Sequence, residues 1–189
     1  MKKHIIFDTE TTGLIRNTLV DIRKQPQIFD FYGYGIDIDT FEEVDELQIW
    51  AKPTIKMEAG AKKATKKDDN FVKDFPPIGG SLQKLKEYIE SAEAVVAHNA
   101  VYDFNIINME FKRHDMKIKW PRVICTIEQT EAGYPDENGN IVFTGYRLSL
   151  TKLHEALFGE KFDGAHEAKT DVRALGRCYI ELIKRGWIK

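Results

Sequence analysis

Short apolar runs separated by polar segments dominate the first third of the chain. The runs 5–8, 28–37 and 46–51 are either apolar throughout or alternate between apolar and polar positions. Alternation with a period of two is typical of β-strands. Asp39 and Thr40 form a turn signal between the second and third runs. We therefore predict a three-stranded antiparallel meander at the start of the fold.

The rest of the chain alternates between helical patterns and short apolar runs. Short buried strands are predicted over 95–97 and 123–126, and helices over 82–91, 102–113, 150–157 and 169–185. Ser81 and Ser149 precede two of these helices, and serine is a favoured N-cap residue. This order predicts an α/β fold in which a mixed sheet, the antiparallel meander plus parallel strands, is flanked by helices.

Three segments lack a regular pattern. Residues 11–27 contain glycine, asparagine and proline, and are expected to form a loop with at most a helical turn. Residues 52–75 contain seven lysines and little apolar material, which indicates a surface loop or a short helix. Residues 136–140 have the composition of a hairpin tip or exposed loop, within an insertion, 133–146, that carries no motif.

The composition narrows the classes of function. The 189 residues carry a net charge of −2 and are 42% hydrophobic, which fits one domain with a sizeable core. That charge argues against a DNA-coating protein or a polybasic membrane binder, but not against a nuclease. Two distant cysteines, Cys125 and Cys178, indicate reduced, half-buried thiols rather than a disulfide framework or a zinc site. No apolar run approaches the ~20 residues that span a bilayer, so we expect a cytoplasmic protein without a membrane partner.

Acidic residues recur where expected strands end or helices begin. Asp8 and Glu10 would share one face of a strand, where two carboxylates repel each other unless a cation such as a divalent metal lies between them. Asp103 stands at the start of one helix, and Asp171 follows His166 by five positions near the start of another. Each has an ordinary alternative, as a capping or surface acid or a structural histidine. Their combination favours metal-dependent phosphodiester hydrolysis.

The stretches 8–14, 98–103 and 166–171, which contain these residues, resemble the Exo I, Exo II and Exo III motifs of the DEDDh (DnaQ-like) 3′→5′ exonucleases. This family includes the DNA polymerase III epsilon subunit, ribonuclease T and oligoribonuclease. Residues 8–14, Asp-Thr-Glu-Thr-Thr-Gly-Leu, match Exo I in full. Residues 98–103 match Exo II, with Tyr102 where phenylalanine is frequent, and His166 with Asp171 matches Exo III. The resemblance covers nearly the whole chain and implies a single exonuclease domain over residues 1–189 with an RNase H-like fold.

The resemblance also implies a two-metal mechanism. Asp8, Glu10, Asp103 and Asp171 would hold two divalent cations, Mg²⁺ or Mn²⁺, which aim a water at the terminal phosphorus and neutralise the leaving oxygen. His166 would be the general base, since an imidazole with a pKa of ~6.5 suits that task. The product would be a nucleoside 5′-monophosphate.

The resemblance also implies which residues would contact the substrate. The backbone around Thr9 and Thr11 would meet the terminal sugar, and Leu14 would wedge against the last bases. The nucleotide pocket would be lined by His98, Asn99 and Tyr102. Plain core packing for Leu14 and a turn position for Asn99 are the alternatives.

Two positions depart from the family pattern. Many relatives have His-Gly-Ile-Thr where this chain has Lys-Lys-Ala-Thr at 62–65. Lys62 or Lys63 could contact substrate phosphate, although a solvated lysine-rich loop is the interpretation we favour. Relatives often have Asp-Thr where this chain has Cys125 and Thr126, and we interpret Cys125 as a packing residue rather than a nucleophile.

Three hypotheses follow. The first is a 3′→5′ exonuclease acting on single-stranded DNA, the second is the same chemistry on RNA or short oligoribonucleotides, and the third is a non-catalytic nucleic-acid or polymerase-binding module. Likeness to the epsilon group favours DNA and makes a DNA polymerase a candidate partner. Retention of all five residues argues against the third hypothesis. Monomer and homodimer both stay open.

Overall fold

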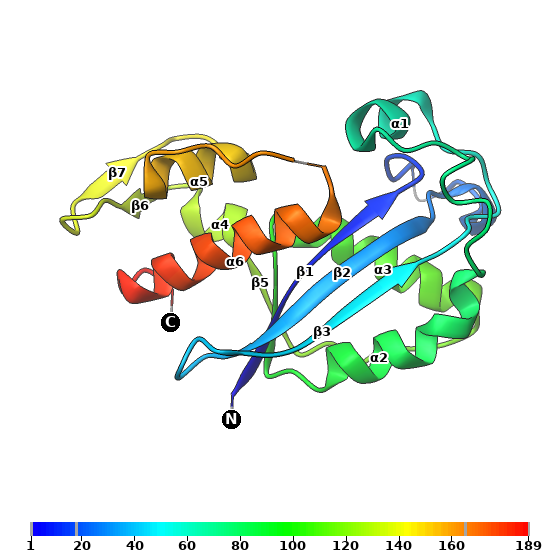
Figure 1. Cartoon of the computed structure of the whole chain (residues 1–189), viewed down its shortest axis with the longest axis horizontal. Helices are drawn as coiled ribbons and strands as arrows, with labels where there is room; N and C mark the ends of the chain where they lie inside the picture. The colour runs from blue at the N-terminus through cyan, green and yellow to red at the C-terminus, as the bar shows by residue number, and fades with distance from the viewer. Residues whose placement is uncertain (1, 18, 165, 189) are drawn as a thin grey trace.

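The computed structural model describes residues 2–17, 19–164 and 166–188, and is built on one five-stranded sheet (Figure 1). The strands lie in the order β3-β2-β1-β4-β5. The meander pairs antiparallel and β4 and β5 run parallel to β1, so the predicted mixed sheet is confirmed. The strands are β1 (Lys3–Thr11), β2 (Ile28–Asp37), β3 (Glu43–Trp50), β4 (Ala94–Ala97) and β5 (Arg122–Cys125).

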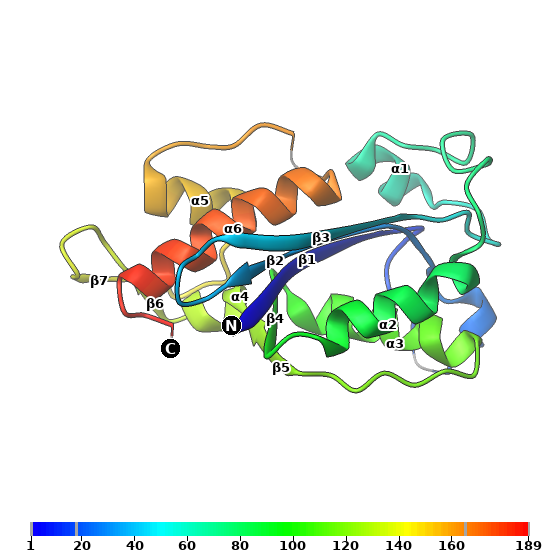
Figure 2. The same cartoon turned by 60° about the horizontal axis from the view of Figure 1, so that its bottom comes forward.

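Helices cover both faces of the sheet (Figure 2). Helices α2 (Leu82–Glu90) and α3 (Ala100–Arg113) lie on one face, and α5 (Leu150–Phe158) and α6 (Ala168–Lys184) lie on the other. The shorter elements are η1 (Ile22–Lys24), α1 (Ala59–Thr65), η2 (Ile78–Ser81), α4 (Thr126–Thr130) and the hairpin β6 (Gly133–Pro135) and β7 (Ile141–Phe143). Within the described residues, no helix has the length and apolar character needed to cross a bilayer.

The central strand β1 is buried on both faces. Ile5 and Phe7 pack in the core beneath α2 and α3, whereas Ile6 packs in the core beneath α5 and α6. Side chains of a strand alternate between faces, so an uninterrupted apolar run supplies both cores. Asp8 follows this run directly, which places the first acid where the strand leaves the core.

Helix α6 approaches the sheet closely at Gly176. A methyl group at this position would overlap the hydroxyl of Tyr34 on β2. The glycine therefore allows α6 to pack against β2, and this packing holds the start of α6 beside the end of β1. Gly176 thus contributes to placing Asp171 near Asp8.

The boundaries predicted from sequence differ from the structure at several elements. β1 continues beyond Asp8 to Thr11, because antiparallel pairing with β2 extends that far. Ser149 caps α5 as expected, accepting a hydrogen bond from the Lys152 backbone N–H. Ser81 also occupies the N-cap position of α2, as expected, but its side chain makes no capping hydrogen bond, because Ser81 ends the 3₁₀ turn η2, which runs directly into α2.

The second half of the chain adds two features. The strand predicted over 123–126 ends at Cys125, and the short helix α4 begins at Thr126. Residues 136–140 connect β6 to β7, as the hairpin prediction expected. Cys125 and Cys178 are buried free thiols rather than half-buried ones.

Candidate active site

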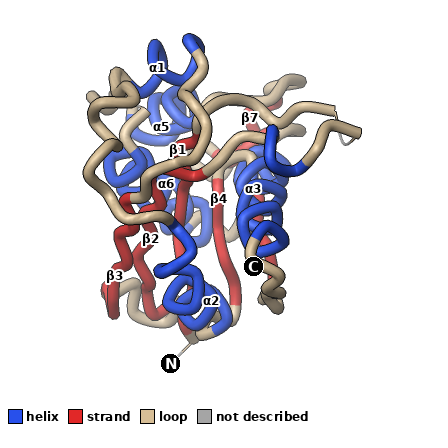
Figure 3. The backbone as a smooth tube through the Cα atoms, turned by 90° about the vertical axis from the view of Figure 1, so that its right-hand side faces the viewer, coloured by secondary structure: helices blue, strands red, loops and turns tan. Residues whose placement is uncertain are grey.

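The end of β1 presents two carboxylates on one face. Asp8 and Glu10 are two residues apart on the strand, so their side chains leave it on the same side. In Figures 1 and 3 this end of β1 lies beneath α1. Asp171, in the first turn of α6, completes a group whose carboxylate oxygens lie within 4.8 Å of one another.

Asp103 lies beside this group, in the first turn of α3. Its Oδ1 accepts hydrogen bonds from the Thr9 backbone N–H at 3.1 Å and from Thr9 Oγ1 at 2.6 Å. Asp103 is therefore held by Thr9 and is not part of the three-residue group. The negative charge of Asp103 nevertheless reaches Asp8, whose pKa it helps to raise.

Burial raises the pKa of every carboxyl in the site, and the charges of other site carboxylates add to the rise at Asp8 and Glu10. The pKa of Glu10 rises to about 8, mainly through burial and then through the charges of Asp171 and Asp30. Burial raises the pKa of Asp103 to about 7 against the opposing hydrogen bonds from Thr9. The pKa of Asp8 lies well above its usual range, and that of Asp171 is also raised, in both cases mainly by burial.

These carboxylates fit divalent cations. Asp171 Oδ1 is buried and has no hydrogen-bond partner among the described residues. Crowded oxygen ligands of one charge are the donor set that hard cations such as Mg²⁺ and Mn²⁺ prefer. A cation would offset the repulsion that raises the pKa values, so the donor chemistry and the orphaned oxygen agree with metal binding.

His166 stands at the rim of the carboxylate group. Its backbone N–H donates to Asp171 Oδ2 at 2.9 Å, and its φ of 71° lies in the left-handed region that few side-chain-bearing residues adopt. No hydrogen bond to the imidazole ring is formed within the described residues, and the side chain is exposed. The hydrogen bond to Asp171 fixes the backbone of His166 and leaves its imidazole ring exposed at the rim.

One cavity of about 590 Å³ brings most of the predicted residues together. It is lined by Asp8, Thr9, Leu14, His98, Asn99, Tyr102, Asp103, Ile127, Ser149, Leu150, Thr151, Phe162, His166 and Asp171. We call it the catalytic cavity. Glu10 and Thr11 line an adjoining cavity of about 380 Å³, which shares Thr9, Leu14 and Tyr102 with the first.

The segment after β1 is tied to α3 through Tyr102. The hydroxyls of Thr11 and Tyr102 lie 2.6 Å apart, and the Gly13 carbonyl accepts from both. This anchoring leaves Leu14 with its side chain 75% exposed at the junction of the two cavities. Core packing is therefore the wrong interpretation for Leu14.

His98 and Asn99 play different parts at the cavity wall. His98 Nε2 lies 3.0 Å from the Leu148 carbonyl and Nδ1 lies 2.8 Å from Thr126 Oγ1, so both ring nitrogens are engaged. Burial, with the positive charge of Arg147 in the same direction, lowers the pKa of His98 to about 4. Asn99 is exposed and has the left-handed backbone of a turn residue just before α3. Asn99 is therefore both a turn residue and a residue of the cavity wall, so the two interpretations of this position do not exclude each other.

The lysine-rich segment 52–75 forms one wall of the adjoining cavity, but none of its lysines lines that cavity. The wall residues from α1 are small or hydroxylic: Gly60, Ala61, Ala64 and Thr65. Lys62 forms an ion pair with Asp69 instead, and Lys63 is exposed. Both lysines lie on the short helix α1, and these contacts favour a solvated surface position over a contact with substrate phosphate.

A buried ion pair behind Glu10 was not expected from the sequence. Asp30 lies opposite Glu10 in the β1–β2 pairing and is 1% exposed. Its carboxylate accepts from Gln48 Nε2 and lies 3.4 Å from Lys67 Nζ, which sits over the Trp50 ring. Burial raises the pKa of Asp30 to about 6, and Lys67 opposes this rise. The sequence signal for this buried pair was Asp30 itself, an acid within the apolar run of β2.

The family model RNase T, described as an exonuclease, matches residues 5–179. The chain belongs to the RNase T exonuclease family. Members of this DnaQ-like family are exonucleases that depend on divalent metals, which agrees with the carboxylate group at the end of β1.

Relatives and solved structures agree with the family and the fold. The chain is 30% identical over 183 residues to the DNA polymerase III PolC-type of Streptococcus thermophilus, an alignment covering 96% of this chain and 11% of that protein. The chain thus spans about 11% of the length of this curated relative.

Two solved structures share the fold of this RNase T family member. The zinc-bound E. coli ExoI–ssDNA complex superposes with a TM-score of 0.75 at 15% identity, covering 97% of this chain and 41% of that one. A 3′-exonuclease that recognises the histone mRNA stem-loop gives a TM-score of 0.73 at 16% identity, covering 98% and 83%. The expected RNase H-like fold is confirmed.

Proposed function

We propose that the chain removes nucleoside 5′-monophosphates one at a time from the 3′ end of single-stranded DNA. The observation that carries the proposal is the convergence of Asp8, Glu10 and Asp171 within 4.8 Å, beside Asp103 and His166. Four carboxylates and one imidazole at a single cavity are the groups that metal-assisted phosphodiester hydrolysis requires.

Each residue has a role that follows from its position. Asp8, Glu10, Asp103 and Asp171 would hold two divalent cations, and these would supply charge neutralisation at the phosphate and a more acidic water. His166 would accept the proton of that water at a ring nitrogen. The His166 N–H bond to Asp171 Oδ2 would keep the imidazole above the cluster.

The cavity walls would hold the terminal nucleotide. Leu14, exposed between the two cavities, would press against the terminal bases, and Asn99 and Tyr102 would line the nucleotide pocket. The side chains of Thr9 and Thr11 are engaged by Asp103, Gly13 and Tyr102, so these residues would meet the terminal sugar through backbone groups other than the Thr9 N–H, which also donates to Asp103. His98 would act as a wall fixed by its two hydrogen bonds.

DNA is favoured over RNA as the substrate by the similarity to a DNA polymerase III PolC-type protein. That similarity also supports action beside a DNA polymerase. RNA stays the second candidate, since a similar fold belongs to a 3′-exonuclease that recognises a histone mRNA stem-loop. A contact to the ribose 2′-hydroxyl would be the physical basis of an RNA preference.

The test is a degradation assay on single-stranded DNA and RNA of matched sequence, both labelled at the 5′ end. We expect a ladder that shortens from the 3′ end with Mg²⁺ or Mn²⁺ and not with EDTA, and faster shortening of DNA. A faster rate on RNA would move the proposal to the second candidate. Absence of shortening of both strands by folded protein would contradict it.

A further inference from the structure

The hairpin and the segment after it carry exposed aromatic and basic side chains that the catalytic site does not use. Phe143 and Tyr146 are 82% and 54% exposed. Arg147 and Lys152 are exposed as well, and Lys152 Nζ lies 5.4 Å from the centre of the Tyr146 ring. We call these four residues the aromatic–basic strip.

The strip rests on a fixed support. Arg185, at the end of α6, donates from Nη1 to the Pro135 carbonyl of β6 at 2.7 Å. Thr144 Oγ1 donates to the Glu131 carbonyl at 2.9 Å, and Trp187 Nε1 donates to the Gln129 carbonyl at 2.7 Å. The first bond joins the hairpin to the body of the molecule, the second closes the base of the hairpin, and the third ties the C-terminal segment to α4, which precedes the hairpin.

The strip lies next to the catalytic cavity along the chain. Phe143, Tyr146 and Lys152 line a cavity of about 350 Å³ together with Leu148. The next residues, 149–151, line the catalytic cavity, and the Leu148 carbonyl accepts from His98. In Figure 1 the hairpin lies at the left end, and the chain runs from it back to the start of α5. A strand leaving the catalytic cavity past His98 would therefore meet the strip.

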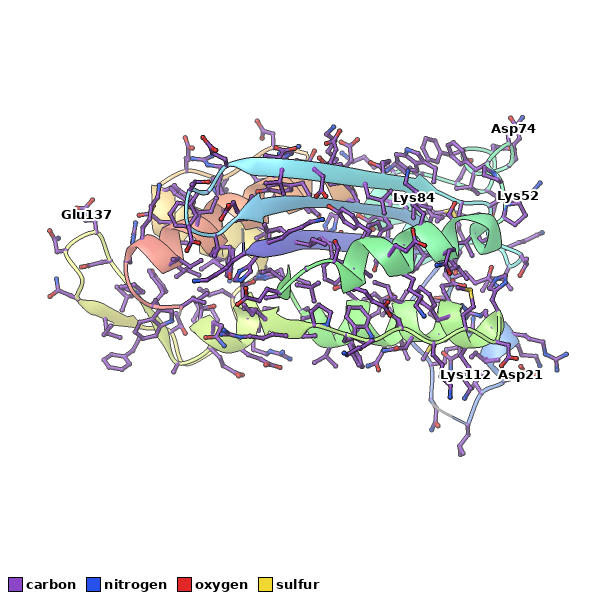
Figure 4. All side chains as sticks on the ribbon, turned by 90° about the horizontal axis from the view of Figure 1, so that it is seen from below. Asp21, Lys52, Asp74, Lys84, Lys112 and Glu137 are labelled. Carbon is purple, nitrogen blue, oxygen red and sulfur yellow. The ribbon has the colours of Figure 1, made fainter. Side chains whose placement is uncertain are left out.

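The charge of the strip suits a polyanion. Within the described residues neither Arg147 nor Lys152 forms an ion pair. Glu155 lines the same cavity as the strip, and Lys161, 3.8 Å away, offsets its charge. Glu137 stands at the tip of the hairpin, at the far end of the molecule (Figure 4). Two unpaired cations beside two exposed rings are the elements of a single-stranded nucleic-acid surface.

We propose that the aromatic–basic strip binds the substrate strand on the 5′ side of its terminal nucleotide. Unpaired bases stack on Phe143 and Tyr146, and Arg147 and Lys152 neutralise the phosphates between them. Only the direction of the bound strand, with its 3′ end in the catalytic cavity, rests on the proposed function. The strip determines how tightly longer strands bind, and leaves the chemistry at the terminal phosphodiester unchanged.

The test compares strand lengths in the Phe143→Ala/Tyr146→Ala variant. Stacking of one base on an aromatic ring changes affinity by about 5- to 150-fold. We expect the Kd for a fluorescent single-stranded DNA of about 12 nucleotides, measured by anisotropy in EDTA, to rise at least about 10-fold. Cleavage of a dinucleotide with Mn²⁺ should keep its wild-type rate. Leu19→Ala, which truncates a side chain 92% exposed elsewhere, is the control.

The basic residues have a separate readout. In Arg147→Gln and Lys152→Gln, the slope of log Kd against log salt concentration should fall by about 0.7 for each lost phosphate contact. An unchanged Kd for the longer strand in the aromatic variant would overturn the proposal and leave this face to a protein partner. Because binding is measured without metal, this outcome is distinct from a failure of the enzyme to cleave.

Discussion

At the scale of single residues, the site is defined by carboxylates that lie too close together to be ionised at once without a cation. Burial is the largest cause that raises the pKa values of Asp8 and Glu10, and the nearby charges of Asp171, Asp103 and Asp30 raise both further. The metal-free protein therefore retains protons in the site near neutral pH. Divalent cations and protons compete for the same oxygens.

This competition predicts an unusual dependence of stability on pH. The pKa of Glu10 rises from 4.5 to about 8 on folding, so the folded state holds a proton that the unfolded chain has released. The free energy of unfolding should fall as pH rises from about 5 to about 8, because the folded state binds more protons over that window. Thermal unfolding in EDTA at both ends of the window measures this, and Glu10→Gln should flatten the dependence.

Addition of Mn²⁺ should reverse the trend. The ions stabilise the folded state by mass action, and they bind more tightly once the carboxylates are ionised. The rise in Tm on adding Mn²⁺ should therefore be larger at the alkaline end of the window. Equal rises at both ends would argue against metal binding by these carboxyls.

Substitution of His166 should affect the rate of hydrolysis but not the binding of metal ions. His166→Ala should lower kcat by about 10²- to 10⁴-fold, which is the usual contribution of a positioned general base. The affinity for Mn²⁺ should stay unchanged, because no metal-ligand role is proposed for the imidazole. Kinetics and calorimetry on the same preparation test both parts, with His114→Ala, another exposed histidine, as the control. A wild-type kcat in His166→Ala would remove it from the mechanism.

At the scale of elements, the sequence predicts most strands and helices and the antiparallel meander, but not the side-chain contacts between elements. Alternation identifies β2, and an acid interrupts its apolar run at Asp30. Nothing in the sequence says that Asp30 meets Lys67, because that contact depends on how the loop after β3 folds back over the sheet. Ser81 shows the same limit, since a 3₁₀ turn upstream of α2 replaces the capping bond that its residue type suggests.

The Asp30–Lys67 pair predicts a stability effect at this scale. Lys67→Met leaves the Asp30 carboxylate buried without its counter-charge and should destabilise the fold by about 3 kcal/mol. The double variant Asp30→Asn/Lys67→Met should recover most of the loss, because no uncompensated charge remains. Urea unfolding measures both, and Lys63→Met at an exposed position is the control. A loss below about 0.5 kcal/mol, the range of neutral surface changes, would contradict the role of the pair.

At the scale of the whole molecule, the fold brings segments from three distant parts of the chain to one end of β1. The three motifs identify the acids, and the order of elements predicts the mixed sheet that gathers them. The geometry adds what motifs leave open: Asp103 is engaged by Thr9, and Leu14 is exposed rather than packed in the core. The hairpin of residues 133–143 has no motif, so its exposed rings become visible only once it is folded and anchored.

The most direct test of the account measures Mn²⁺ binding and cleavage on the same preparation of the wild-type protein and Asp8→Asn. We predict that the wild-type protein binds two ions by calorimetry and shortens single-stranded DNA from the 3′ end only when they are bound. Asp8→Asn should lose most of both properties while its circular dichroism spectrum stays unchanged. Cleavage at the wild-type rate by Asp8→Asn, or by the wild-type protein in EDTA, would contradict the central claim that these carboxylates hold the metals of an exonuclease.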